Sequence, residues 1–188
     1  MSTDFIFLIG PRACGKSTVA ATISRLLPGW RAVDLDREYN LRKAKSSRIR
    51  LMENPETYYE GSKQILMEHL QGKRLILALG GGTMINPKSP NGDFDVIVSC
   101  HTRGPVILLL PSRIPLIAKW ILFRREQQRE YDLPEKMLSQ LRKATNRGFD
   151  QRIDFYHQNA DFTLYGRNPE RLARSIIKKC QLKAYTRP

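Results

Sequence analysis

The residues best suited to chemistry lie near the start of the chain, where two glycines lead into a lysine and a serine. Gly10, Gly15, Lys16 and Ser17 fit the pattern G-x-x-x-x-G-K-[ST]. Glycines let the main chain approach phosphate oxygens closely, and the loop N–H groups with a helix N-terminus can surround an anion. The lysine can reach the β- and γ-phosphates, and the serine hydroxyl can bind Mg²⁺. The segment predicts nucleoside triphosphate binding by Gly10, Ala13, Cys14, Gly15, Lys16, Ser17 and Thr18.

The sequence on both sides of this loop supports the same interpretation. Residues 5–9 are apolar at every position, as in a strand that is buried on both faces. After the loop, Val19, Ile23 and Leu27 recur on one helical face, and Pro28-Gly29 ends the helix. A strand before the loop and a helix after it argue against a glycine-containing turn that matches the pattern by chance.

Two further segments that could do chemistry follow predicted strands. Asp34 and Asp36 come at the end of residues 31–34, and three glycines, 80–82, follow residues 75–79. The plain alternatives are surface acids at a strand end and a flexible turn. Open α/β sheets bind ligands at the carboxyl ends of their strands, which favours the functional interpretation. We expect the carboxylates to face the lysine-bearing loop and the bare glycine backbone to approach a ligand.

Short apolar runs that alternate with helical patterns predict an α/β fold, a five-stranded parallel sheet with helices on both faces. The expected strands are 5–9, 31–34, 75–79, 106–110 and 162–165. The expected helices follow Ser17 and Asn168 and span about 55–70, 112–123 and 134–157.

The segment 124–132 is strongly charged and has no apolar face. It is either a solvated helix end or a mobile lid. Because a phosphate loop is present, we favour a lid over about 124–135, whose arginines could close over a transferring phosphate.

Composition limits the class of protein and its partners. The 188 residues predict a single domain, 1–188, and 32 Lys and Arg against 18 Asp and Glu give a net charge of +14. This excess favours anionic partners, namely a nucleotide, an acidic metabolite or nucleic acid. No nucleic-acid-reading motif accompanies it, and the basic stretch 41–50 fits a solvated helix face, so we expect a small-molecule substrate and no nucleic acid.

The remaining composition predicts a reduced, cytoplasmic, monomeric protein that does not enter a membrane. The three widely spaced cysteines suggest neither a disulfide framework nor a metal site. The chain runs directly into its first strand without a signal-peptide pattern, and no apolar run approaches membrane-spanning length.

Four features in order resemble the shikimate kinases, which are small P-loop kinases of the nucleoside-monophosphate-kinase fold. They are the phosphate loop, Asp34-x-Asp36, Gly80-Gly81-Gly82, and Arg152-x-x-x-Tyr156 before the last strand. The resemblance covers nearly the whole chain. It implies a P-loop kinase fold with a lid, with ATP and Mg²⁺ as cofactors. The implied reaction is transfer of the ATP γ-phosphate to the 3-hydroxyl of shikimate.

The resemblance also implies roles for the matching residues. Lys16 would stabilise the γ-phosphate, and Ser17 with Asp34 would hold Mg²⁺. Asp36 would hold the substrate hydroxyls and accept or orient the attacking proton. The other implied contacts are Gly81, Gly82 and Arg152 with the substrate, and Arg125, Arg167 and Pro169 with the nucleotide.

The sequence departs from the family pattern in three places. Ala13 replaces the middle glycine of the loop, and the lid pattern Arg-Pro-Leu-Leu is reduced to Leu133-Pro134. Tyr58-Tyr59 stand where the family has Phe-Arg, so the arginine that grips the shikimate carboxylate is missing, and Tyr59 is assigned to the substrate site by position. The arginines that could supply the lost charge are Arg124, Arg125 and Arg129.

Three hypotheses for function remain open at this point. The first is a shikimate kinase, and the second is a related kinase of another polyol or cyclitol. The third is a non-catalytic nucleotide-binding or nucleic-acid-binding protein, suggested by the basic charge. The joint presence of Lys16, Ser17, Asp34 and Asp36 favours an enzyme.

Overall fold

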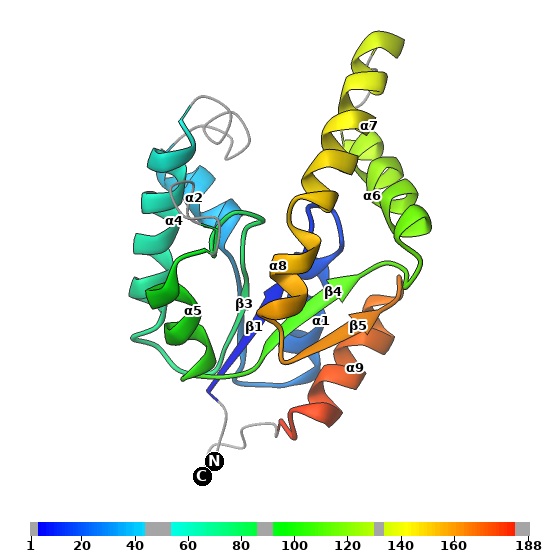
Figure 1. The fold of residues 1–188 in the computed structure, drawn as a ribbon. Helices are drawn as coiled ribbons and strands as arrows, with labels where there is room; N and C mark the ends of the chain where they lie inside the picture. The colour runs from blue at the N-terminus through cyan, green and yellow to red at the C-terminus, as the bar shows by residue number, and fades with distance from the viewer. Residues whose placement is uncertain (1–3, 44–53, 86–91, 130–133, 183–188) are drawn as a thin grey trace.

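The computed structural model of the chain describes residues 4–43, 54–85, 92–129 and 134–182. Its centre is a sheet of five parallel strands in the order β2-β3-β1-β4-β5 (Figure 1). The strands are β1 (Phe5–Ile9), β2 (Arg31–Asp34), β3 (Leu75–Ala78), β4 (Val106–Leu110) and β5 (Phe162–Tyr165). The predicted five-stranded parallel sheet is confirmed, with the third strand one residue shorter than expected.

The register of the sheet decides which loops meet. Phe5 to Leu8 of β1 pair with Leu75 to Ala78 of β3, and Phe7 to Ile9 pair with Val106 to Leu108 of β4. Every residue of β1, β3 and β4 is buried, as their unbroken apolar sequences require. Since β1 and β3 are neighbours, the loop after β1 and the glycines after β3 leave the sheet side by side.

Helices cover both faces of the sheet. In Figure 1, α5 and α8 lie in front of the strands and α1 lies behind them, where it packs against α9. At the carboxyl edge of the sheet, α2 and α4 stand on one side and α6 and α7 on the other. The helices are α1 (Lys16–Leu26), α2 (Leu35–Lys43), α4 (Pro55–His69), α5 (Phe94–His101), α6 (Pro115–Arg129), α7 (Glu135–Asp150), α8 (Ile153–Gln158) and α9 (Pro169–Lys179).

Local sequence explains where two of these helices begin. The side chain of Asn54 accepts a hydrogen bond of 3.0 Å from the N–H of Thr57, and proline is the first residue of α4. The expected start of the last helix is confirmed in the same way, because Asn168 accepts a bond of 3.0 Å from the N–H of Arg171. None of the helices in the described part of the chain has the length and apolarity of a membrane span.

The expectation of one helix over 134–157 is wrong. The chain forms α7 and α8 instead, and Arg152 between them leaves the helical conformation, with φ −121° and ψ −12°. The break turns the Arg152 side chain to the glycine segment after β3, where it bonds the Gly81 carbonyl.

Other helices also differ from expectation. The helix expected over 112–123 continues to Arg129, so the first half of the expected lid is helical, while 130–133 lie outside the described residues. Helix α5 was not expected, and α2 begins at Leu35, before the helix face expected over 41–50. Of the basic stretch 41–50, the structure places Leu41 and Arg42 on the exposed side of α2, and 44–50 lie outside the described residues.

Candidate active site

The loop between β1 and α1 has the backbone that its glycines predict. Gly10 and Gly15 have φ of 138° and 107°, and a Cβ at Gly10 would lie 2.6 Å from the carbonyl oxygen of Leu109. Ala13 adopts φ 60°, a left-handed conformation that is unfavourable for a residue with a Cβ. The cap residue of α1 is Gly15, so no side chain competes for the N–H groups at the positive end of the helix.

Lys16 lies inside the loop and is nearly buried. Its Nζ donates to the carbonyl oxygens of Gly10 at 2.9 Å and Pro11 at 3.1 Å. The ammonium group is therefore held at the centre of the ring of main-chain atoms that precedes α1, where it can meet a phosphate.

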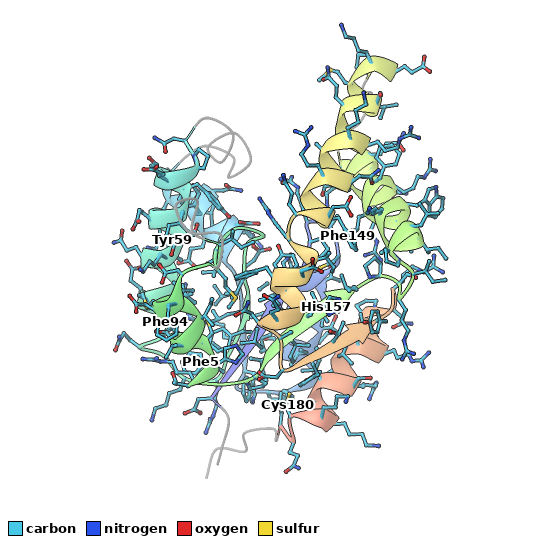
Figure 2. All side chains as sticks on the ribbon, viewed as in Figure 1. Phe5, Tyr59, Phe94, Phe149, His157 and Cys180 are labelled. Atoms are coloured by element: carbon cyan, nitrogen blue, oxygen red, sulfur yellow. The ribbon has the colours of Figure 1, made fainter. Side chains whose placement is uncertain are left out.

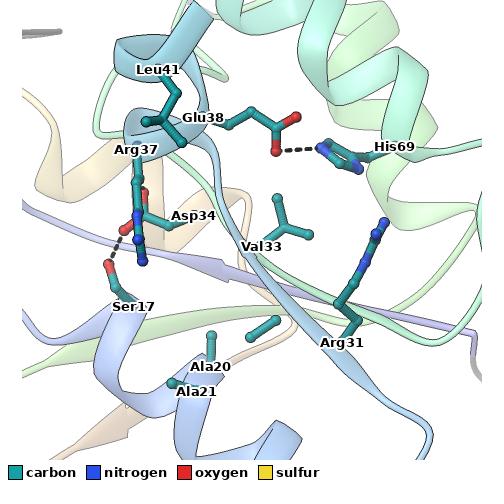
Figure 3. A pocket seen from close by; sticks show the side chains of 11 residues that line it. Ser17, Ala20, Ala21, Arg31, Val33, Asp34, Arg37, Glu38, Leu41 and His69 are labelled. Atoms are coloured by element: carbon teal, nitrogen blue, oxygen red, sulfur yellow. Dashed lines mark hydrogen bonds and ion pairs between the residues drawn. The ribbon is translucent and has the colours of Figure 1, made fainter.

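Ser17 and Asp34 form a pair of oxygen ligands beside the loop. The Ser17 hydroxyl donates to Oδ2 of Asp34, while Oδ1 of Asp34 accepts a bond of 3.1 Å from the N–H of Arg37 (Figure 3). A hydroxyl and one carboxylate suit Mg²⁺, which is usually bound by one or two carboxylates together with substrate phosphates. Consistent with such a sparse site, no group of three or more His, Cys, Asp or Glu in the described ranges could hold a metal.

Asp36 faces the same space from the first turn of α2. A cavity of about 260 Å³ is lined by Arg12, Lys16, Ser17, Asp34, Asp36 and Arg129, among others. Oδ1 of Asp36 accepts a hydrogen bond from the hydroxyl of Tyr58 on α4. Burial, and then the charge of Asp36, raises the pKa of Tyr58. The structure thus brings together the predicted phosphate, metal and acid–base residues at one edge of the sheet.

The glycine segment after β3 is fixed by two side chains from α8 and the turn before it. The carbonyl oxygen of Gly81 accepts two hydrogen bonds, one of 3.0 Å from Nη1 of Arg152 and one of 2.8 Å from the hydroxyl of Tyr156. A Cβ at Gly81 would lie 3.3 Å from Nη1 of Arg152, so glycine permits this approach. Burial raises the pKa of Tyr156, so its hydroxyl remains a donor to this carbonyl. The next residue, Gly82, lies beside the ring of Tyr58.

A second cavity, of about 300 Å³, joins the loop to α6 and α9. It is lined by Ala13, Cys14, Gly15, Thr18, Arg125, Gln128, Arg129, Gly166, Arg167 and Pro169, among others. Arg125 donates from Nη1 to the carbonyl oxygens of Ala13 at 3.1 Å and Cys14 at 3.2 Å. The residues predicted to contact the nucleotide away from its phosphates therefore share one space, and Arg125 lies in the helical part of the expected lid.

A third cavity, of about 300 Å³, lies on the other side of the loop. Arg12 and Arg152 both line it, together with Glu126, Phe149 and Tyr156. Figure 2 labels Phe149, on α7. Nε of Arg12 lies 2.8 Å from Oε2 of Glu126, whose side chain is 4% exposed. Neither Arg12 nor Glu126 was predicted, because an ion pair between distant segments leaves no signal in a single sequence.

Tyr59 is placed differently from the position-based expectation. It lies on α4 (Figure 2). Its hydroxyl donates to Oδ2 of Asp93, which also lies 2.9 Å from Nζ of Lys63, and only 2% of Tyr59 is exposed. Burial alone raises the pKa of Asp93, but hydrogen bonds from Lys63, Tyr59 and the N–H of Val96 lower it to about 2. Burial and the Asp93 contact raise the pKa of Tyr59. A substrate contact by Tyr59 stays a prediction.

The groove at the outer side of β2 contains a hydrogen bond between Glu38 and His69. Glu38 on α2 and His69 at the end of α4 meet at 2.8 Å across a cavity of about 400 Å³ (Figure 3). Although desolvation alone raises the pKa of Glu38, the contacts with His69 and Arg42 lower it. Ser17 and Asp34 line the inner end of this groove, so it continues from the metal pair.

Comparison with known proteins adds independent findings. A family model described as "Shikimate kinase" matches residues 12–181. The curated shikimate kinase of Psychromonas ingrahamii is 27% identical over 85% of each chain, and that of Legionella pneumophila is 29% identical over 92% of each.

Solved structures agree at the level of the fold. The shikimate kinase from Acinetobacter baumannii in complex with shikimate aligns with a TM-score of 0.74, at 21% identity, over 95% of this chain and 93% of that one. The shikimate kinase from Bacteroides thetaiotaomicron aligns with a TM-score of 0.72, at 19% identity, over 96% and 100%.

Proposed function

Because the chain belongs to the shikimate kinase family, we propose that it transfers the γ-phosphate of ATP to the 3-hydroxyl of shikimate. The family consists of ATP-dependent phosphotransferases that act on an alcohol group. The observation that carries the proposal for this chain is that Lys16 and Asp36 line one cavity. A cation for the phosphate and a carboxylate for the attacking hydroxyl then border the same space.

The nucleotide would occupy two adjoining spaces. Its phosphates would lie in the loop around Lys16, at the N-terminus of α1. Its base would lie in the cavity that Arg125, Arg167 and Pro169 line. Arg125 is already fixed on two loop carbonyls, so it would connect the base end to the phosphate end.

Ser17 and Asp34 fit Mg²⁺ and would hold it. Their oxygen atoms are already paired with each other, and Asp34 is anchored by the N–H of Arg37. The cation would supply neutralisation of charge on the phosphate oxygens.

The remaining chemistry belongs to side chains of this protein. Asp36 would accept a hydrogen bond from the attacking hydroxyl and take its proton as the oxygen bonds to the γ-phosphorus. Lys16 would stabilise the negative charge on the transferring phosphoryl group, and the bond to the β-phosphate oxygen would break to release ADP. Arg152, with its planar fork of donors, suits the substrate carboxylate.

A screen of ADP release tests this assignment. The purified chain would be given MgATP with shikimate, quinate, gluconate or no acceptor, and the Lys16→Ala variant prepared in parallel would correct for contaminating kinases. We expect shikimate to give the highest turnover. Release of ADP that no acceptor increases would contradict the assignment.

A related kinase of another polyol or cyclitol is the second candidate. The observation that favours it is Tyr59 at the position of the family's carboxylate-gripping arginine, with its hydroxyl bound to Asp93. Preference for an acceptor without a carboxylate in the same screen would establish this alternative.

The proposal also covers partners and location. We propose a monomeric cytoplasmic enzyme whose excess of basic residues serves anionic small molecules and not nucleic acid. Retention on a nucleic-acid column at physiological salt, with a steep salt dependence, would contradict the last point.

A further inference from the structure

Tyr58 is the side chain that contacts the proposed base directly. Its hydroxyl donates to Oδ1 of Asp36, and Tyr58 stands where the family pattern described above has a phenylalanine. The ring position is therefore shared with the family pattern, while the hydroxyl and its bond to the carboxylate are features of this chain.

The packing around Tyr58 leaves its ring little freedom. Tyr58 is 2% exposed, and its ring meets that of Tyr39 edge-on, with centroids 5.0 Å apart and planes at 65°. A Cβ at Gly61 would lie 2.5 Å from the Tyr39 ring, so a glycine in α4 makes room for that neighbour. The Tyr58 hydroxyl is consequently held at one place.

The glycine segment closes over the other side of the pair. A Cβ at Gly80 would clash with Oδ1 of Asp36 and would lie 2.5 Å from the hydroxyl oxygen of Tyr58. Oδ1 is thus enclosed between the tyrosine and the main chain. Asp36 also lines the cavity of about 260 Å³ that contains Lys16, so its carboxylate is open to a ligand on that side.

We propose that Tyr58 is a positioning residue for Asp36, fixing one carboxylate oxygen so that the other alone receives the attacking hydroxyl. The proposal rests on the function proposed above. During transfer, the hydroxyl proton moves to Oδ2 as the new oxygen–phosphorus bond forms, while the proton of Tyr58 stays on its own oxygen, hydrogen-bonded to Oδ1. A carboxylate held in one orientation spends more of its time in the reactive geometry.

The protonation state of Tyr58 agrees with this role. Burial, followed by the charge of Asp36, raises the pKa of Tyr58, so the hydroxyl stays a donor at neutral pH. The charge of Arg152 acts on the pKa of Tyr58 in the opposite direction, but burial and Asp36 outweigh it.

The test compares Tyr58→Phe with Tyr39→Phe. Each change removes one buried hydroxyl and keeps the ring, but within the described residues the Tyr39 hydroxyl has no hydrogen-bond partner. We expect Tyr58→Phe to lower kcat about tenfold and to leave KM for MgATP unchanged. The effect is smaller than the loss of about a hundredfold expected when the base itself is removed. Tyr39→Phe should keep the kcat of the unmodified chain, and thermal unfolding would verify that both variants fold.

A double variant separates positioning from a general loss of structure. If Tyr58 acts through Asp36, adding Tyr58→Phe to Asp36→Asn should lower kcat by less than about twofold. The proposal would be overturned if Tyr58→Phe lowered kcat equally in the unmodified chain and in Asp36→Asn. It would also be overturned if Tyr58→Phe alone left kcat unchanged.

Failure of the proposed function gives a different result. It would be seen as absence of shikimate turnover in the unmodified chain. The ratio of kcat between Tyr58→Phe and the unmodified chain is measured with whichever acceptor of the screen is phosphorylated. This ratio therefore tests the role of Tyr58 whether or not that acceptor is shikimate. No acceptor-dependent turnover with any compound would overturn both.

Discussion

Arg12 of the phosphate loop and Glu126 of α6 form an ion pair, with 2.8 Å between Nε and Oε2. The neighbouring Arg125 bonds the carbonyl oxygens of Ala13 and Cys14, so two consecutive residues of one helix hold the loop. Nε of Arg12 is used in this contact, and about half of the side chain is exposed towards the cavities on both sides of the loop.

Glu126→Gln should therefore change nucleotide binding more than stability. The change removes the ion pairs of Glu126 with Arg12 and with Arg129, the latter at 3.5 Å. Their loss is offset because a buried carboxylate is no longer desolvated, and we expect the free energy of unfolding to change by less than about 1 kcal/mol. With Arg12 no longer fixed, KM for MgATP should rise about threefold or more. Glu68→Gln, which removes the Glu68–Arg42 pair on the surface, is the matched control. Equal KM values in both variants would show that the pair does not serve the loop.

Lys16→Ala should abolish phosphoryl transfer in a folded protein. The change removes the ammonium group from the loop, and the loss of one charge-stabilising donor lowers turnover by at least about a hundredfold. The sheet beneath the loop does not depend on Lys16, so circular dichroism should remain unchanged. Undiminished ADP release would refute the assignment of the loop.

Arg152 and position 59 can be tested against the substrate carboxylate. Arg152→Ala should raise KM for shikimate about tenfold or more, since a bond between charged groups is lost, and leave KM for MgATP unchanged. Tyr59→Arg alone should change KM for shikimate little, because the new guanidinium would pair with the Asp93 carboxylate. Adding Asp93→Asn would free it, and KM for shikimate should then fall. A fall in KM from Tyr59→Arg alone would mean that the side chain can turn to the substrate.

Asp93 links α4 to the start of α5, and its contribution to stability should depend on pH. Its pKa is lowered from 3.8 to about 2 in the folded chain, so its contribution is present above pH 4 and is lost as the pH falls through 2. The shift corresponds to about 2 kcal/mol at neutral pH.

Asp93→Asn tests this dependence because asparagine can still cap α5. Chemical denaturation should show a loss of about 2 kcal/mol at pH 7 that shrinks between pH 5 and pH 2. Asp95→Asn, at an exposed position in the first turn of the same helix, is the control and should change stability by less than about 0.5 kcal/mol. A loss from Asp93→Asn that is the same at pH 7 and pH 3 would contradict the charge-based explanation.

The sheet could be predicted because its information is local. Five short runs of strand length, unbroken and apolar in β1, β3 and β4, led to the observed strands with one end misplaced by a residue. The order of the strands could not be read in this way, since pairing joins segments as distant as β4 and β5. The break at Arg152 was missed for the same reason, because it is stabilised by a carbonyl that belongs to residue 81.

The candidate site divides along similar lines. Short motifs predicted Lys16, Ser17, Asp34 and Asp36, and the structure brings all four to one cavity. The direction of Tyr59 depended on Asp93, which no motif marks. The bond from Tyr58 to Asp36 crosses between two helices, and no sequence motif marks such a contact.

The all-parallel sheet has a consequence for how the protein acquires its activity. No two neighbouring strands are joined by a hairpin, so every pairing requires closure of a long stretch of chain. The loop at 10–17, the acids at 34–36, the glycines at 80–82 and Arg152 meet only after β1, β2 and β3 have paired and α8 has docked. Folding dominated by such distant contacts is slow, and a partly assembled sheet would hold the loop without its partners. We therefore expect catalysis to recover late during refolding, after helical circular dichroism, because the site needs the completed sheet.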